Sequence, residues 1–333
     1  MDGLLIIDKP AGPTSHDIVA FARRVLGERR VGHTGTLDPA ATGVLPLVLG
    51  RATRLARFLS ASDKSYEAVI RLGVSTDTAD AAGAPIGPGY AGPLPTRDAI
   101  DRAIDAFRGS FLQQPPAFSA KKIDGKRSHR LARAAARSGA GPLSSTGAGD
   151  PPPARTDADA SPQTARHGRG RSLPDKAQVT VFRLDLVSVA RDCVTLTLDC
   201  SAGFYVRSLA HDLGQALGTG AHLEQLRRTR SGDFTLAGAI DLATAEQHPE
   251  RARAAVVPLA RMLPGLGTVV LTPQGVRRAV NGCDLGPADA VAGSEFGPRG
   301  SEWVRLMDSG GDLVGIAGPA RTPGLLHPSV VLM

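Results

Sequence analysis

Cysteine is scarce in this sequence of 333 residues, which contains only Cys193, Cys200 and Cys283. Three scattered cysteines exclude a disulfide framework, and none of them forms the CxxC spacing of a zinc site. No apolar run approaches the roughly 18 residues of a membrane-spanning helix, and the N-terminal GLLIID is too short for a secretory signal. We therefore expect a cytoplasmic protein with reduced thiols.

Several signatures of common enzyme classes are also missing. The sequence has no HxE with PCxxC, no HExxH, no GxxxxGK(S/T), no GxGxxG opening a helix and no GxSxG. Zinc deaminases, zinc hydrolases, NTPases, dinucleotide enzymes and serine hydrolases are therefore unsupported. Aromatic residues make up only 4% of the chain, too few for an extended base-stacking platform.

Positive charge is abundant. The formal net charge of +7 favours a polyanionic partner, with RNA, DNA and an anionic membrane all open on this observation alone. Histidine is spread thinly, and only His33 lies near the Gly- and Thr-rich segment described below. The residues that remain for chemistry are a carboxylate, an arginine, a tyrosine and this positive charge.

The length indicates about two domains, at about 150 residues per domain. From residue 265 onward, short apolar runs alternate with Gly and Pro turns, which predicts a small β-barrel-like module. The domains are therefore expected at residues 1–264 and 265–333. Residues 138–177 are rich in Gly, Pro, Ser, Ala and Asp with almost no large apolar residue, which predicts a disordered insertion.

Helical and strand periodicities alternate along the rest of the chain, which predicts an α+β fold. Ser15 is a candidate N-cap for a first helix that stops at Gly27, and Thr96 caps a second. Residues 222–230, HLEQLRRTR, form a basic amphipathic segment. Strands are predicted at 3–8, 44–49, 64–72, 178–189 and 193–200.

Asp38 lies in the most distinctive stretch of the chain, residues 32–46, which reads GHTGTLDPAATGVLP. Its glycines and prolines indicate a tight, irregular loop that can aim a side chain. Asp followed by Pro is also a common turn start, so the dipeptide alone favours a turn aspartate that caps backbone N–H groups.

Tyr66 and Arg207 are the other candidates for chemistry. Tyr66 lies on the inward face of the strand at 64–72, where it fits either core packing or stacking on a ligand. Arg207 lies where a strand end meets a helix start after Gly203, and it fits either a solvated cation or a bidentate partner for a carboxylate. The residues leave both alternatives open.

Seven blocks, in order, give the chain a specific resemblance to the bacterial tRNA pseudouridine-55 synthases, the TruB family. This resemblance implies a mixed, mainly antiparallel central sheet of the pseudouridine synthase type with flanking helices, and a C-terminal PUA-type RNA-binding domain. The blocks are DKPAGPTSHD (8–17), RRVGHTGTLDPAATG (29–43), DKSYEAVIRLG (63–73), TDTADAAG (76–83), FSAKKIDGK (118–126), GFYVRSLAHDLG (203–214) and GAHLEQLRR (220–228).

The same resemblance implies roles for individual residues. Asp38 is expected to be the catalytic aspartate, Tyr66 to stack on the target uracil and Arg207 to pair with Asp38, lowering its pKa by about 1 to 3. Residues expected to bind the substrate are His33, Tyr205, Leu226, Lys64, Asp80 and Lys122. Residues of a supporting motif beside the pocket are Lys9, Pro10 and Gly12.

The implied reaction moves uracil from an N1 to a C5 link with the ribose, in the T-arm stem-loop of tRNA. It involves no redox change and no phosphoanhydride, so no cofactor and no metal are expected. We expect a stand-alone monomer with a tRNA partner and no membrane partner. Two alternatives are a non-catalytic RNA-binding or RNA-folding protein on the same scaffold, and a guide-RNA-dependent pseudouridine synthase.

Overall fold

The computed structural model describes residues 1–116, 122–123, 126–127, 174–294, 296–297 and 302–333. The greater part of the predicted insertion, residues 138–173, lies outside this range. At its C-terminal end a strand already begins at Ala177.

A mixed sheet of ten strands forms the larger part of the molecule, with the order β14-β1-β3-β12-β4-β11-β10-β7, β13 beside β12 and β2 beside β3. The pairs β1–β14 and β3–β12 are parallel and the others are antiparallel, so the predicted mainly antiparallel sheet is confirmed. The strands are β1 (Gly3–Lys9), β2 (Val31–His33), β3 (Thr42–Leu49), β4 (Lys64–Leu72), β7 (Gly109–Gln113), β10 (Ala177–Ala190), β11 (Cys193–Cys200), β12 (Ala221–Ser231), β13 (Phe234–Thr235) and β14 (Ile240–Asp241).

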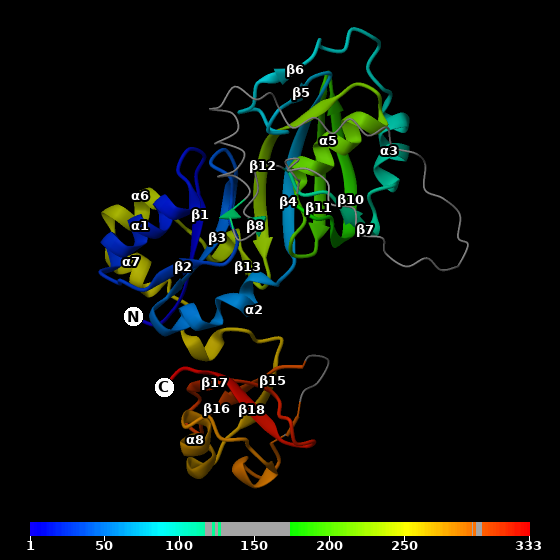
Figure 1. The fold of residues 1–333 in the computed structure, drawn as a ribbon. Coiled ribbons are helices and arrows are strands. Elements are labelled where there is room, and N and C mark those ends of the chain that lie inside the picture. Colours follow the sequence, from blue (N-terminus) through cyan, green and yellow to red (C-terminus); the bar gives the residue numbers. More distant parts are fainter. Residues whose placement is uncertain (117–121, 124–125, 128–173, 295, 298–301) are drawn as a thin grey trace, which may run out of the picture.

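Helices flank this sheet at both ends, with α1, α6 and α7 beside β1 and with α3 and α5 beside β10 and β11 (Figure 1). None of the described helices is long and apolar enough to cross a membrane. The helices and 3-10 turns of this part are α1 (Ser15–Leu26), η1 (Gly50–Leu55), α2 (Ala56–Ser60), α3 (Arg97–Asp105), α5 (Val206–Ala216), η2 (Leu236–Gly238), α6 (Leu242–Gln247), α7 (Pro249–Ala254) and η3 (Leu259–Arg261). Short hairpins are formed by β5 (Ser75–Thr76) with β6 (Pro85–Ile86) and by β8 (Lys122–Ile123) with β9 (Lys126–Arg127).

Helix α1 begins one residue earlier than the sequence predicted, at Ser15. Its N-cap is Thr14, whose side chain accepts from the Asp17 N–H while the Asp17 carboxylate accepts from the Thr14 N–H. This reciprocal capping box satisfies two helix-terminal donors. The prediction of Ser15 as the cap was therefore wrong, and the Ser15 hydroxyl is used elsewhere, as described below.

Strands β1 and β3 are buried on both faces, which explains their nearly continuous apolar sequences. Leu5 and Ile7 point into a core shared with α1, α6 and α7. Leu4 and Ile6, on the opposite face, join a core with η1, α2 and the C-terminal residues. The period of two along a strand thus sends alternate side chains into two separate cores.

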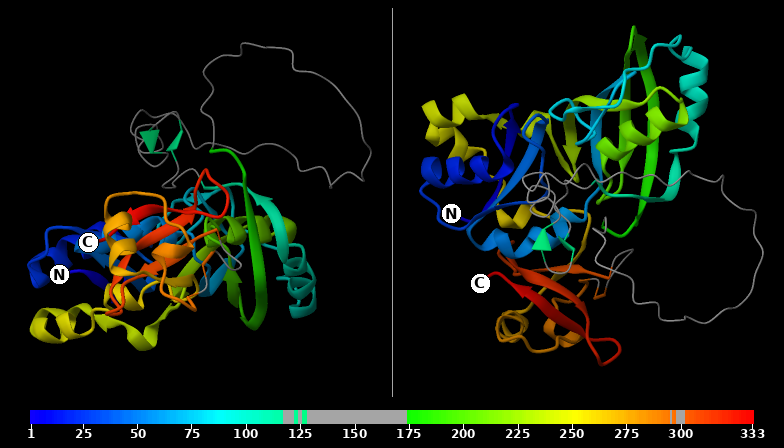
Figure 2. Two further views of the ribbon diagram at one scale, coloured as in Figure 1. Left: turned by 90° about the horizontal axis from the view of Figure 1, so that it is seen from below. Right: turned by 45° about the horizontal axis from the view of Figure 1, so that its top comes forward.

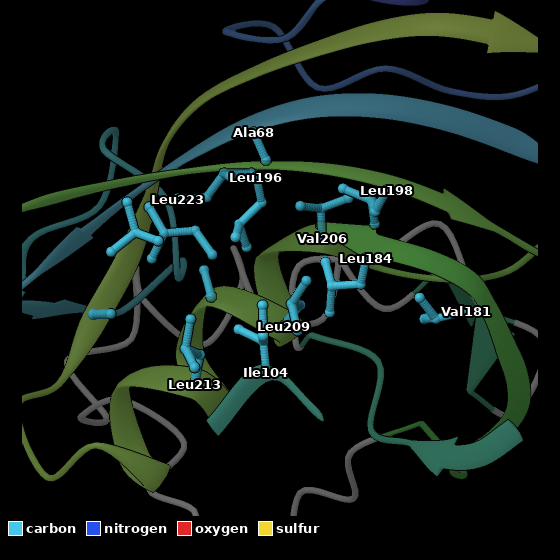
Figure 3. Close-up of a cluster of buried hydrophobic side chains, with 14 of the residues drawn as sticks. Ala68, Ile104, Val181, Leu184, Leu196, Leu198, Val206, Leu209, Leu213 and Leu223 are labelled. Carbon is cyan, nitrogen blue, oxygen red and sulfur yellow. The ribbon is translucent and has the colours of Figure 1, made fainter. Parts of the chain in front are cut away.

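The other half of the sheet packs its inner face against α5 and α3. Figure 3 shows Leu209 and Leu213 of α5 and Ile104 of α3 facing Leu196 and Leu223 of the sheet. The predicted inward face of β4 is confirmed, with Lys64, Ala68, Ile70 and Leu72 all buried.

Strand β12 joins these two halves of the sheet. The basic segment at 222–230 lies in this strand, which pairs in parallel with β3 and antiparallel with β4. Gly43 on β3 has φ +101°, and a Cβ added there would lie 2.1 Å from the Arg228 carbonyl oxygen. Only glycine allows so close an approach at this point.

A second, four-stranded sheet forms the C-terminal module, which fits the predicted PUA-type domain, although the described strands do not close into a barrel. Met307, Leu313, Ile316 and Leu332 of this module share a hydrophobic core with Leu4. It lies below α2 (Figure 1; Figure 2, right). Its elements are β15 (Gly267–Val270), α8 (Pro273–Val280), η4 (Pro287–Asp289), β16 (Val304–Met307), β17 (Leu313–Pro319) and β18 (Leu326–Val331).

Gly43→Ala should lower the free energy of unfolding by at least about 2 kcal/mol, because backbone strain at positive φ adds to a clash with a backbone oxygen. Gly27→Ala is the matched control. Gly27 also has a positive φ, but a Cβ there meets nothing within 4 Å, so only about 1 kcal/mol should be lost. Urea unfolding of both variants measures the difference, and equal losses would show that β3 and β12 are not held this closely.

Candidate active site

A cavity of about 250 Å³ opens where β4, β12 and the loop after β2 meet the start of α5. This volume is at the small end of ligand pockets and fits one ring-sized group. Six of the predicted site residues line this cavity: Asp38, Lys64, Tyr66, Tyr205, Arg207 and Leu226. Other lining residues are Gly35, Thr36, Leu37, Ser60, Ser201, Gly203, Phe204, Val206 and Arg228.

Arg207 and Asp38 form a two-point ion pair at the cavity wall. The Arg207 Nε lies 2.9 Å from Asp38 Oδ2, and its Nη2 donates to Asp38 Oδ1 at 3.3 Å. Arg207 is only 7% exposed, whereas 40% of the Asp38 side-chain surface is open. A rigid, buried guanidinium therefore orients a carboxylate that remains accessible from the cavity.

Asp80 lies behind this pair rather than in the cavity wall. Its Oδ2 is 3.8 Å from the Arg207 Nη1, which also donates to the Thr78 carbonyl at 3.2 Å. The Asp80 Oδ1 accepts from the Thr78 hydroxyl and the Ala82 N–H, so the acid is fixed within its turn. Arg207 is thus held between two carboxylates, and the predicted substrate contact of Asp80 stays a prediction.

The loop that carries Asp38 is fastened by the predicted supporting motif. Lys9 is fully buried, and its Nζ donates to the carbonyls of Pro10, Pro39 and Ala41 at 2.9, 3.0 and 2.7 Å. The Gly12 N–H donates to the Pro39 carbonyl at 2.8 Å. The residues on the C-terminal side of Asp38 are therefore anchored to the end of β1.

Ser15 anchors the other side of Asp38. Its Oγ accepts from the Leu37 N–H at 2.9 Å and donates to the Leu37 carbonyl at 3.1 Å. Ser15 and Leu37 are both buried, so neither backbone group has water as an alternative partner. Leu37 immediately precedes Asp38, which makes Ser15 a positioning residue that the sequence reading did not identify.

Tyr66 on β4 and Leu226 and Arg228 on β12 form the sheet side of the cavity. Arg228 lies opposite Tyr66 in the β4–β12 ladder. Arg228 is only 1% exposed, and its guanidinium donates to the Val44 carbonyl at 2.7 Å and the Gly35 carbonyl at 3.0 Å. Because side chains two apart on a strand share a face, assigning 222–230 to a strand would have placed Arg228 beside Leu226.

Burial controls the electrostatics of the cavity. It raises the pKa of Asp38 above its usual 3.8, with Asp80 adding to the rise and Arg207 and Lys9 opposing it. Arg207 lowers this pKa as predicted, but desolvation outweighs the ion pair, so the net shift is upward. Burial also raises the pKa of Tyr66, so this side chain is a neutral phenol at neutral pH.

Two buried lysines carry lowered pKa values for the same reason. Burial lowers the pKa of Lys9 to about 8, and it lowers the pKa of Lys64 to about 8 as well. Lys64 lines the cavity and donates its Nζ to the carbonyls of Ser60 and Ser62, so it also secures the turn after α2. Both lysines hold backbone next to the site.

Two further predicted substrate contacts are not brought into the described cavity wall. His33, at the end of β2, accepts from the Gly35 N–H at 3.4 Å and meets His16 edge to face at 5.4 Å. Lys122 lies on β8, and its side chain is outside the described residues. Their predicted roles stay predictions.

The arrangement suits chemistry on a small planar ring. A phenol and an aliphatic side chain provide flat apolar surfaces, and an accessible carboxylate lies at the edge of the same cavity. Such a carboxylate can act as a nucleophile or as a base. Among the described residues, no group of three or more His, Cys, Asp and Glu side chains could hold a metal ion.

Comparison with known proteins is consistent with this geometry. Two family models match, "TruB family pseudouridylate synthase (N terminal domain)" at residues 23–141 and "tRNA pseudouridylate synthase B C-terminal domain" at residues 207–266. The tRNA pseudouridine synthase B of Solibacter usitatus is 40% identical, with all of both chains covered. That of Corynebacterium diphtheriae is 42% identical, covering 74% of this chain and 73% of its own.

Solved structures with the same fold include a Cbf5-Nop10-Gar1 complex. Its matching chain has a TM-score of 0.68 and 26% identity, covering 100% of this chain and 85% of that one. An H/ACA RNP bound to a substrate RNA containing 2'-deoxyuridine gives a TM-score of 0.66 and 25% identity, covering 99% and 85%.

Ser15→Ala should lower kcat for uridine isomerisation by roughly 10- to 100-fold with little change in KM, because Leu37 loses both hydrogen bonds to the Ser15 hydroxyl and Asp38 is misplaced. Thr14→Ala is the matched control on the adjacent residue. It should cost about 0.5 to 2 kcal/mol of stability through loss of the helix cap, while kcat stays unchanged. If Ser15→Ala retains full kcat at a temperature where both variants are folded, Ser15 does not position Asp38.

Asp80→Asn should shift the acid limb of the kcat/KM profile to lower pH by roughly half to one pH unit. The carboxylate of Asp38 must be ionised to react, so activity falls as the pH drops through its raised pKa. Removing the negative charge of Asp80 lowers that pKa, and the asparagine oxygen still accepts from Thr78 and Ala82. Asp77→Asn, in the same turn, should leave the limb in place, and a limb that fails to move in Asp80→Asn would show that Asp80 does not act on Asp38.

Proposed function

The chain belongs to the TruB family of pseudouridylate synthases, and we propose that it isomerises the uridine of the tRNA T-arm at position 55, with Asp38 as the catalytic carboxylate. It is an isomerase that converts uridine to pseudouridine in tRNA. The single observation that carries the assignment of the site is the ion pair of Arg207 with Asp38 in a cavity that Tyr66 also lines. These residues come from three distant parts of the chain.

The reaction breaks the N1–C1′ bond, turns the uracil and joins C5 to C1′. The proton on C5 is lost and N1 gains one, so the product has the same composition as the substrate. Asp38 can attack C1′ or C6, or it can accept the C2′ proton, and each route needs an ionised and oriented carboxylate. Arg207 supplies the orientation, since its guanidinium contacts both carboxylate oxygens.

The target uridine has to leave its RNA loop to reach this cavity, at a cost of a few kcal/mol. Stacking of the base on Tyr66 offsets part of this cost, because base–aromatic stacking contributes about 1 to 3 kcal/mol. Leu226 and Tyr205 provide further contact surface around the base, and Lys64 fixes the turn at the cavity edge.

The chain acts on tRNA as a stand-alone monomer in our proposal, without a guide RNA. Its solved relatives include proteins in multi-component assemblies, the H/ACA RNP and the Cbf5-Nop10-Gar1 complex. The tRNA pseudouridine synthase B of Solibacter usitatus is matched over all of its own length, whereas the matching chain of the Cbf5-Nop10-Gar1 complex is matched over 85% of its length. We assign residues 265–333 to a PUA-type RNA-binding domain and residues 1–264 to the catalytic domain, and we place the enzyme in the cytoplasm.

Asp38→Asn should reduce isomerisation by about 10³-fold or more while the Kd for tRNA changes little, because only the reacting carboxylate is replaced. The measurement is tritium release from 5-tritiated uridine in tRNA, with no guide RNA or other protein present. Wild-type protein that is folded but releases no tritium would contradict the stand-alone activity. Equal rates for wild type and variant would exclude Asp38 as the catalytic residue.

A further inference from the structure

A second cavity, of about 500 Å³, lies between the catalytic sheet and the C-terminal module. Its walls are the half-buried side chains of Phe58, Leu263, Leu266 and Trp303, and it is larger than the active-site cavity. No step of the reaction described above uses it. The remaining lining residues are Arg57, Ala61, Ser62, Asp233 and Gly265.

The two cavities are neighbours that share one turn of the chain. Ser60 lines the active-site cavity, whereas Ala61 and Ser62 line the second one. The Lys64 ammonium donates to the carbonyls of Ser60 and Ser62 and so fixes this turn from the active-site side. In Figure 1, α2, which ends at Ser60, lies between the large sheet and the C-terminal module. The two cavities therefore lie on either side of the same turn.

The turn at Gly232 places Asp233 at the rim of the second cavity. The Gly232 N–H donates to the Asp63 carbonyl at 2.8 Å, and a Cβ on Gly232 would lie 3.0 Å from Ser62. Asp233 is exposed. An ionised carboxylate only accepts hydrogen bonds, so the Asp233 side chain is complementary to an amino group, which donates them.

The aromatic wall of the second cavity is built around a stacked cation. The Arg57 guanidinium lies 4.6 Å from the centre of the Phe58 ring and 5.2 Å from that of Trp303, and it donates to the Ser329 hydroxyl at 2.6 Å. The rings of Phe58 and Trp303 meet edge to face at 5.3 Å. Aromatic rings and arginine planes together are the surfaces on which unpaired RNA bases stack.

We propose that this second cavity binds another unpaired nucleobase of the tRNA substrate, one that carries an exocyclic amino group. Phe58, Trp303 and Arg57 provide the stacking surface, and Asp233 accepts a hydrogen bond from the amino group of adenine, cytosine or guanine. Uracil has no amino group and is bound more weakly. The proposal rests on tRNA being the substrate. It adds a second point of contact between the enzyme and this RNA, outside the active-site cavity.

Trp303 is the only tryptophan of the chain, so intrinsic tryptophan fluorescence reports on this cavity alone. Titration with AMP, CMP, GMP and UMP should give saturable quenching, with at least one amino-bearing nucleotide binding about fivefold or more tighter than UMP. Asp233→Ala should remove this preference and raise the Kd for tRNA about tenfold, because it removes the acceptor oxygens. Asp63→Ala, an equal charge change on the adjoining turn, should do neither.

Saturating tRNA should give the Asp233→Ala variant the same kcat as wild type, since the active-site cavity is unchanged. The proposal is overturned if no nucleotide and no tRNA alters Trp303 fluorescence, or if Asp233→Ala and Asp63→Ala bind nucleotides and tRNA equally. Quenching by all four nucleotides with equal affinity would likewise remove the role of Asp233. Tritium release by the wild-type enzyme is measured separately, so a failure of the proposed catalytic function is distinguishable from a failure of this second site.

Discussion

The buried guanidinium of Arg207 is the constraint on which the site depends. It contacts both oxygens of Asp38 and is itself held by Asp80 and the Thr78 carbonyl. A buried cation of this kind needs partners, because an unpaired charge away from water is strongly destabilising. These contacts bring three segments together at the wall of the cavity: the turn at residues 78–80, the start of α5 and the loop before β3.

The centre of the sheet makes this convergence possible. Strand β12 joins β3 to β4, and Gly43 lets the β3 backbone come close to Arg228. Arg228 then reaches the carbonyls of Val44 and Gly35 on either side of the catalytic loop. Lys9 and Ser15 complete the support of that loop from β1 and α1. The reactive carboxylate thus lies on an irregular loop whose backbone is hydrogen-bonded to rigid elements. These hydrogen bonds hold the carboxylate in a defined position.

Local patterns in the sequence were sufficient for much of this architecture. The alternation in 64–72 correctly predicted the buried face of β4, and the family blocks predicted the mixed sheet and six of the residues that line the cavity. Other features depend on tertiary contacts that no local pattern encodes. The net upward shift of the Asp38 pKa does not follow from its partner Arg207, because desolvation depends on the whole surrounding fold. Thr14 and Ser15 are both suitable helix caps, but the Asp three residues after Thr14 indicates the capping box that the structure has.

The cavity between Asp38, Tyr66 and Leu226 is the place where we expect the target base to bind. A crystal structure with a T-arm stem-loop that carries 5-fluorouridine at the target position tests this claim most directly. We predict that the fluorinated base lies everted in this cavity, stacked on Tyr66, with the Asp38 carboxylate in contact with or bonded to its ribose or ring and Arg207 still paired with Asp38. A base that remains stacked in the RNA loop, or that binds elsewhere with this cavity empty, would contradict the account.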